Sequence, residues 1–204
     1  TNTGISSMAV VFVATTSSIT YISNGQTFTS YIIYLILGGI IGGYLGSKLT
    51  FSLDTKTLQR IFALLLLVVS YRMMFGEGFS ARYEENIFLY LLIGILSGIL
   101  SGLLGIGGGI VRIPLLIFFG GLGNLAAQGF SLIATVPTAL TAAYTKLKND
   151  REFAKRGCIV GISGILGSII GGNLAFDLPQ ELLNTSFSIF LLLVSINMLL
   201  KTTK

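Results

Sequence analysis

Long apolar runs separated by short polar connections dominate the chain. Seven runs can be read from the sequence, at residues 5–21, 30–49, 58–75, 87–119, 126–145, 158–176 and 182–200. Apolar runs of about 18 residues or more are long enough to cross the hydrocarbon core of a bilayer as helices. The charged residues fall between the runs, whereas a soluble helical bundle would carry them along one face of amphipathic helices. The pattern therefore predicts an all-α, polytopic transmembrane helix bundle.

The fourth run, residues 87–119, is too long for one ordinary span. Four glycines and a proline interrupt it: Gly105, Gly107, Gly108, Gly109 and Pro114. Irregular backbone at membrane depth is tolerated only where it lines a cavity or packs against protein. We therefore expect a glycine-broken helix or a re-entrant hairpin at this point.

The two ends of the chain align without gaps when one is shifted by 125 positions. Glycines carry this register, because Gly4, Gly39, Gly42 and Gly46 fall on Gly129, Gly164, Gly167 and Gly171. A shared glycine register across apolar segments is stronger evidence of duplication than matching Leu or Val. The sequence predicts a complete second repeat at residues 80–204 and a first repeat at residues 1–79. The first repeat lacks its opening hairpin, which would correspond to the glycine-broken segment.

Loop charges predict that the two repeats have opposite orientations. The connection at residues 146–156 holds five Lys and Arg residues, whereas its counterpart at residues 22–29 holds none. The connection at residues 48–60 is also basic, and the only charged residues in its counterpart at residues 173–183 are Asp177 and Glu181. Lys and Arg concentrate in cytoplasmic loops. Equivalent loops are thus expected on opposite sides, as in the inverted-topology repeats of secondary transporters, whose substrate site lies near the midplane.

Composition supports the membrane class and removes several chemistries. Apolar residues make up 52% of the chain and charged residues 10%, against about a quarter charged in soluble domains. Mean hydropathy is +0.85. The net charge of +5 lies in the loops, so it indicates membrane orientation, with the lipid bilayer and not nucleic acid as the partner. Thr1 follows no basic n-region, so no signal peptide is expected, and the chain fits one that begins partway through a gene product.

The chain contains no histidine and one cysteine, Cys158. An intrachain disulfide, a cysteine-based metal cluster and a histidine proton shuttle are therefore excluded, and we expect neither a metal nor a cofactor. The acidic residues all lie in predicted loops or at the ends of runs, so no carboxylate is available as a proton relay. With no buried base and no Ser–Lys pair within a run, we do not expect an enzyme.

The glycine cluster and the arginine behind it are the strongest candidates for binding a substrate. Backbone N–H groups of Gly105, Gly107, Gly108 and Gly109 can form an anion-binding concavity, and a helix starting there adds its positive end. Arg112 is the only formal charge well inside a run, and a guanidinium binds small oxyanions bidentately. The alternatives are that these glycines serve helix packing, and that Arg112 extends to the surface or pairs with a helix-end carbonyl.

A second candidate stretch contains Gln128 and Ser131 and continues to Thr135, Thr138 and Thr141. The repeat pairs Ser131 with Ser6 in the first half. Hydroxyls buried along a helix can coordinate a substrate, or they can bond backward to helix carbonyls near Pro137. Both interpretations stay open from the sequence alone.

Residues 102–109 (GLLGIGGG) are followed by Pro-Leu-Leu at 114–116, and further glycine-containing stretches lie at 127–132 and 164–172. This combination resembles the signature of the sulfite exporter TauE/SafE family. The resemblance implies a multi-pass transporter of the bacterial or archaeal cytoplasmic membrane that moves small sulfur-containing anions such as sulfite or organosulfonates. The alternatives are a passive anion channel and a non-transporting scaffold subunit. The oligomeric state is left open, a homo-oligomer included.

Overall fold

The computed structural model describes residues 2–49, 55–75, 86–104, 108–147 and 151–203. Every regular element in these ranges is a helix: α1 (Asn2–Ser23), α2 (Ile32–Leu49), α3 (Thr55–Phe75), α4 (Ile87–Leu104), α5 (Gly109–Phe118), α6 (Asn124–Leu147), α7 (Arg151–Asp177) and α8 (Gln180–Thr203). The all-α prediction is thereby confirmed. The fourth apolar run corresponds to two helices, α4 and α5, and residues 105–107 between them lie outside the described residues.

Two helices are long and apolar enough to cross a membrane by length and composition. These segments are Lys155–Asp177 in α7 and Gln180–Leu200 in α8. Five shorter apolar helical segments accompany them among the described residues: Met8–Ser23, Ile32–Gly46, Phe62–Phe75, Ile87–Leu100 and Gly109–Phe118. Within the described residues, each predicted apolar run overlaps at least one helix.

Helices α2 and α4 pack with their backbones in contact, because glycines line the seam between them. A Cβ atom built at Gly38, Gly42 or Gly46 would overlap a backbone carbonyl oxygen of α4, at Leu91, Ile95 and Ile99 respectively. Both series advance in steps of four residues, so the two helices run parallel. Small residues at such a seam allow the close approach on which helix association in a bilayer depends.

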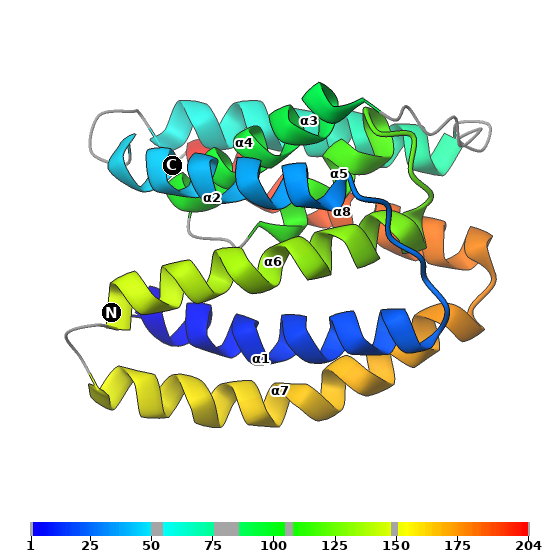
Figure 1. The fold of residues 1–204 in the computed structure, drawn as a ribbon. Helices are drawn as coiled ribbons and strands as arrows, with labels where there is room; N and C mark the ends of the chain where they lie inside the picture. Colours follow the sequence, from blue (N-terminus) through cyan, green and yellow to red (C-terminus); the bar gives the residue numbers. More distant parts are fainter. Residues whose placement is uncertain (1, 50–54, 76–85, 105–107, 148–150, 204) are drawn as a thin grey trace.

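Helix α1 lies between α6 and α7, and the three helices are side by side in Figure 1. Glycines again permit the contact: a Cβ at Gly164 of α7 would lie 2.7 Å from Cγ2 of Val13 in α1. A similar contact joins α2 to α6, where a Cβ at Gly39 would lie 3.2 Å from Cγ2 of Thr138. Val13 and Thr138, like Gly39 and Gly164, stand 125 positions apart.

Helices α3 and α8 are joined by two buried hydrogen bonds. The hydroxyl of Ser70 donates to the carbonyl of Ser188 at 2.8 Å, and the hydroxyl of Ser195 donates to the carbonyl of Ala63 at 2.8 Å. Residue numbers rise along one helix as they fall along the other, so α3 and α8 are antiparallel. Ser70 and Ser195, and Ala63 and Ser188, again stand 125 positions apart.

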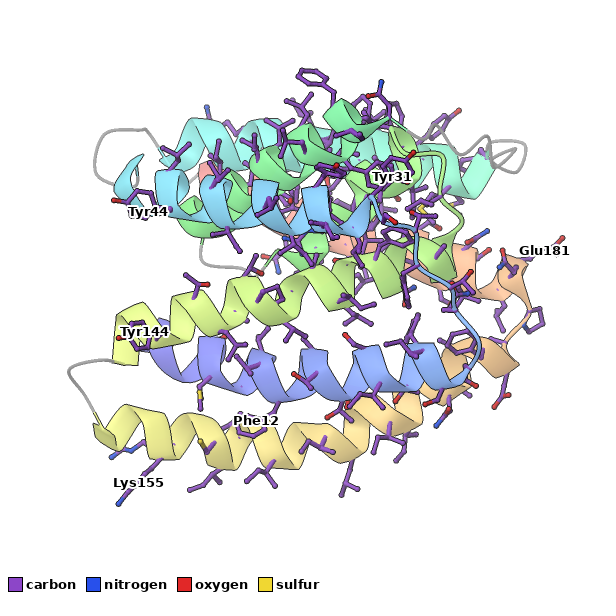
Figure 2. The ribbon with its side chains drawn as sticks, in the orientation of Figure 1. Phe12, Tyr31, Tyr44, Tyr144, Lys155 and Glu181 are labelled. Atoms are coloured by element: carbon purple, nitrogen blue, oxygen red, sulfur yellow. The ribbon has the colours of Figure 1, made fainter. Side chains whose placement is uncertain are left out.

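Charged side chains mark the two ends of the bundle. Figure 2 shows Lys155, near the start of α7, at one end and Glu181, at the start of α8, at the other. Both side chains are exposed. The ends of α1 and α7 that lie toward Glu181 are linked by a hydrogen bond of 3.0 Å from Asn24 Nδ2 to Asn173 Oδ1.

The close packing of α2 against α4 predicts that Ala substitutions at two adjacent glycines have very different effects on the free energy of unfolding. Gly42→Ala forces a methyl group against the backbone of Ile95, and such overpacking costs about 1–3 kcal/mol. At Gly43, no described atom lies within 4 Å of a built Cβ. Gly43→Ala is therefore the matched control and should be neutral or slightly stabilising, because Ala favours helix. Thermal unfolding of the purified protein in detergent measures both, and equal effects would contradict the seam.

Candidate functional site

Arg112 is the most deeply buried charged residue that the structure describes. It lies in the first turn of α5 and is only 1% exposed. Gly108 is the N-cap of this helix, and the backbone N–H of Arg112 donates to its carbonyl at 2.9 Å. Helices α4 and α6 pack against α5, so the guanidinium group lies inside the bundle and does not extend to the surface.

Neutral oxygen atoms hold the guanidinium group. Nε donates to Ser97 Oγ of α4 at 3.3 Å, and Nη1 donates to Ser131 O and Thr135 Oγ1 of α6, both at 3.2 Å. The two hydroxyl oxygens can accept these bonds because each hydroxyl donates its own proton to a carbonyl of its own helix. Ser97 donates to Gly94 O at 3.0 Å, and Thr135 donates to Ser131 O at 2.6 Å. These bonds fix the orientation of the guanidinium plane.

No described carboxylate neutralises this buried charge. The two acidic residues whose side chains the structure describes, Asp177 and Glu181, are both exposed, and Glu181 lies at one end of the bundle (Figure 2). A buried cation is normally paired with an anion, because desolvating a lone charge is costly. The hydroxyl and carbonyl partners lower that cost without cancelling the charge. The site therefore retains a positive potential inside the bundle.

The second terminal nitrogen, Nη2, faces two glycines. A Cβ atom at Gly39 of α2 or at Gly108 would lie 3.0 Å from Nη2, closer than a carbon normally approaches. Within the described residues, Nη2 makes no hydrogen bond of its own. The absence of side chains at both positions keeps this nitrogen, with its two N–H donors, clear of carbon atoms.

Further donors lie close to the guanidinium group. Ser131 is 1% exposed, and its hydroxyl has no hydrogen-bond partner among the described residues. A Cβ at Gly109 would lie 3.7 Å from that hydroxyl oxygen, so the start of α5 and Ser131 are neighbours. The helix itself offers no carbonyl to the N–H groups of its first turn, and its positive end favours an anion. Charge, N–H and O–H donors thus converge on one place, which suits a small oxyanion.

Comparison with known proteins identifies the class to which this arrangement belongs. The sequence matches the family described as sulfite exporter TauE/SafE over residues 1–86 and 89–204. The chain belongs to the TauE/SafE family. This is a family of membrane transporters, not of enzymes. Membership therefore supports a membrane transporter.

Two relatives of this TauE/SafE chain carry the same general designation. A protein of Xylella fastidiosa strain 9a5c, named "Probable membrane transporter protein", is 26% identical over 205 residues, which cover 95% of this chain and 77% of the relative. The Bacillus subtilis protein named "Probable membrane transporter protein YunE" is 29% identical over 120 residues, covering 55% of this chain and 44% of the relative. No solved structure matches the chain with statistical significance.

The structure brings together only some of the residues that the sequence nominated. Gly108, Gly109, Arg112 and Ser131 are neighbours, whereas Gly105 and Gly107 lie outside the described residues. Pro114 is buried in α5 without a described polar partner.

The remaining nominated residues lie elsewhere. Gln128 is one helical turn from Ser131, and its side chain bonds to Tyr21 and Asn124 instead of Arg112. Ser6, nominated by its repeat position, is exposed on α1, and no described hydrogen bond links it to Arg112. The backward bonds considered for the threonines are present, since Thr135, Thr138 and Thr141 each donate to a carbonyl four residues earlier.

Two contributors to the site escaped the sequence reasoning. Ser97 lies in the apolar run of α4, where its only signal was a hydroxyl within a span. Gly39 was noted for its repeat register, yet its contact with Arg112 depends on how α2 meets α5 and α6 in space.

The hydroxyl of Thr135 is expected to stabilise the buried charge. Thr135→Val keeps the shape of the side chain but removes the acceptor of Nη1, and losing a hydrogen bond to a charged group costs about 1.5–3 kcal/mol. Thr16→Val is the matched control, because Thr16 Oγ1 donates only to Phe12 O of its own helix at 2.9 Å. Thermal unfolding in detergent compares the two. Equal destabilisation would show that Thr135 does not support the charge.

Proposed function

We propose that this chain is part of a multi-pass exporter of the cytoplasmic membrane that moves small sulfur-containing oxyanions, such as sulfite or organosulfonates. The observation that carries the proposal is the buried Arg112 guanidinium, which has no described carboxylate partner and whose Nη2 faces Gly39 and Gly108. The family description supplies the sulfur chemistry and the direction. The names of the relatives support a transporter in general.

The chemistry of the site fits an oxyanion with several oxygens on one central atom. Nη2 and the start of α5 can contact one oxygen each, and the hydroxyl of Ser131 can donate to another. A guanidinium binds such a group through parallel N–H bonds, which a lysine ammonium cannot reproduce. Because the surrounding interior is apolar, the attraction between this charge and an anion is stronger than in water.

Inverted-topology repeats are part of the proposal, and reciprocal contacts support them. The hydrogen bonds from Ser70 to Ser188 and from Ser195 to Ala63 exchange partners at a spacing of 125 positions. The contacts of Gly164 with Val13 and of Gly39 with Thr138 do the same. Reciprocal contacts of this kind arise around a two-fold axis. Since α3 and α8 are antiparallel, that axis would run across the helices, which is the geometry of an inverted repeat.

A glycine-broken, re-entrant segment is also part of the proposal. Helix α5 has 10 residues, a length of about 15 Å at 1.5 Å per residue, and so spans about half of a 30 Å hydrocarbon core. Arg112 contacts Ser97 in the middle of α4 and Ser131 and Thr135 within α6. These partners support a site near the midplane.

Anion binding tests the proposed site directly. The full-length gene product in detergent should bind sulfite saturably, and Arg112→Lys should weaken binding by about tenfold or more because the charge remains while the planar fork is lost. Titration calorimetry with sulfite, a sulfonate, sulfate and chloride measures the affinity and the selectivity. A folded protein that binds none of these anions would refute the proposed binding site and would favour a scaffold role.

The glycine that faces Nη2, Gly39, offers a second test of the anion site. Gly39→Ala places a methyl group against Nη2 and should reduce sulfite affinity by about tenfold, whereas Gly43→Ala, four residues further along α2, should leave affinity unchanged. A steep dependence of flux on an ion gradient would separate the transporter from a passive anion channel, which cannot drive accumulation.

The inverted topology can be tested at a pair of equivalent positions. Ser30 and Lys155 stand 125 positions apart and both are exposed. In a Cys158→Ser background, a membrane-impermeant maleimide added to intact cells should label Ser30→Cys but not Lys155→Cys. Permeabilised cells should show labelling of both. Labelling of both from outside the cell would contradict the inversion.

A further inference from the structure

A second buried donor lies apart from the Arg112 site, at the start of α6. Asn124 is the first residue of this 24-residue helix and is 3% exposed. Its Nδ2 atom has no hydrogen-bond partner in the part of the chain that the structure describes. Burying an amide nitrogen without an acceptor lowers the stability of the fold by about 1–3 kcal/mol. Neighbouring hydrogen bonds nevertheless hold the side chain in this orientation.

A chain of hydrogen bonds orients this amide. The hydroxyl of Tyr21 in α1 donates to Gln128 Oε1 at 2.6 Å, and Gln128 Nε2 donates to Asn124 Oδ1 at 2.8 Å. The oxygen of Asn124 is therefore directed toward Gln128, one turn along the helix. Its Nδ2 atom is directed away from that partner and stays available as a donor.

The backbone around Asn124 adds donors of the same kind. The first backbone bond at this end of α6 is from Ala127 N to Gly123 O, at 2.9 Å. The three preceding N–H groups, of Asn124, Leu125 and Ala126, have no backbone partner among the described residues. No acidic residue lies in the first turn of α6. The positive end of the helix is therefore uncompensated beside the free Nδ2 atom.

The position of Asn124 relates it to the Arg112 site. Asn124, Gln128, Ser131 and Thr135 follow one face of α6 at intervals of three and four residues. Asn124 precedes Ser131 by seven residues, which is about 10 Å along the helix. In Figure 1, α6 begins at the end of the bundle where α7 leads into α8, the end that carries Glu181 in Figure 2.

We propose that Asn124 Nδ2 and the first-turn N–H groups of α6 form a second binding position for a small oxyanion, between the Glu181 end of the bundle and Arg112. The proposal rests on the proposed function, since it assigns the approach to the same site. It adds a residue with no role in holding Arg112. In the proposed topology, this position faces the outside of the cell.

Substitution of Asn124 by Asp tests the position once thermal unfolding in detergent has shown that the variant is folded. Asp keeps an oxygen for Gln128 Nε2 and is favoured at helix N-termini, but it removes the donor and repels an anion. Asn173→Asp is the matched control, because Asn173 is exposed at the same end and the substitution retains the oxygen that accepts from Asn24.

The measurement is saturation of labelled sulfite transport by the full-length gene product in right-side-out and everted membrane vesicles. Asn124→Asp should raise KM by about tenfold in right-side-out vesicles only, with the maximal rate retained. Asn124→Ala, which removes the donor without adding charge, should raise it by about threefold. Asn173→Asp should leave KM unchanged in both vesicle types.

The outcomes separate this position from the proposed function. If wild-type vesicles carry no sulfite, the proposed function fails and this position fails with it. If wild-type vesicles transport sulfite and Asn124→Asp behaves like Asn173→Asp, only the second position is overturned. An effect of Asn124→Asp without any effect of Asn124→Ala overturns it as well, because charge repulsion then explains the result without an Nδ2 donor.

Discussion

The burial of one guanidinium charge among neutral oxygens is the constraint on which the structure around α5 depends. Arg112 is held by the hydroxyls of Ser97 and Thr135 and by the carbonyl of Ser131. A carboxylate in any of these places would form a closed ion pair and leave nothing for a substrate to neutralise. Hydroxyls orient the guanidinium without consuming its charge. The apolar surroundings then keep that charge effective, because little water screens it.

Helix α2 links this charge to the packing of the bundle. Gly38, Gly42 and Gly46 occupy one face and allow the backbone of α4 to approach, while Gly39 occupies the adjacent face and allows Arg112 to approach. Gly39 follows Gly38 directly, so one rotational position of α2 allows both the contact with α4 and the contact with Arg112. Because α4 carries Ser97, the close α2–α4 seam also fixes the distance between Ser97 and the guanidinium. Packing glycines and site geometry are thus not separable in this fold.

The sequence predicted those features whose signal is local in the chain. Apolar run length located the helices, and Arg112 stood out because a charge inside such a run is rare. Ser97, Gly39 and Asn124 carried no such signal, since their roles come from the approach of helices distant in sequence. Repeat symmetry nominated Ser6 through Ser131, yet Ser131 lies beside the start of α5, and among the described residues α1 has no comparable neighbour. Symmetry in sequence does not transfer a contact when the described residues contain no counterpart of the partner element.

The two unpartnered donors on α6 differ in what they offer an anion. Asn124 Nδ2 is a neutral amide at a helix end, whereas Ser131 Oγ lies beside the full charge of Arg112. Neutral donors bind anions less tightly than charged ones, so under the proposed function an anion would meet a weaker position at Asn124 and a stronger one beside Arg112. Transport requires binding that is favourable enough for entry and weak enough for release. In the proposed exporter, a weaker position about 10 Å away along the same helix face would shorten the distance over which an anion leaving Arg112 has no protein donor.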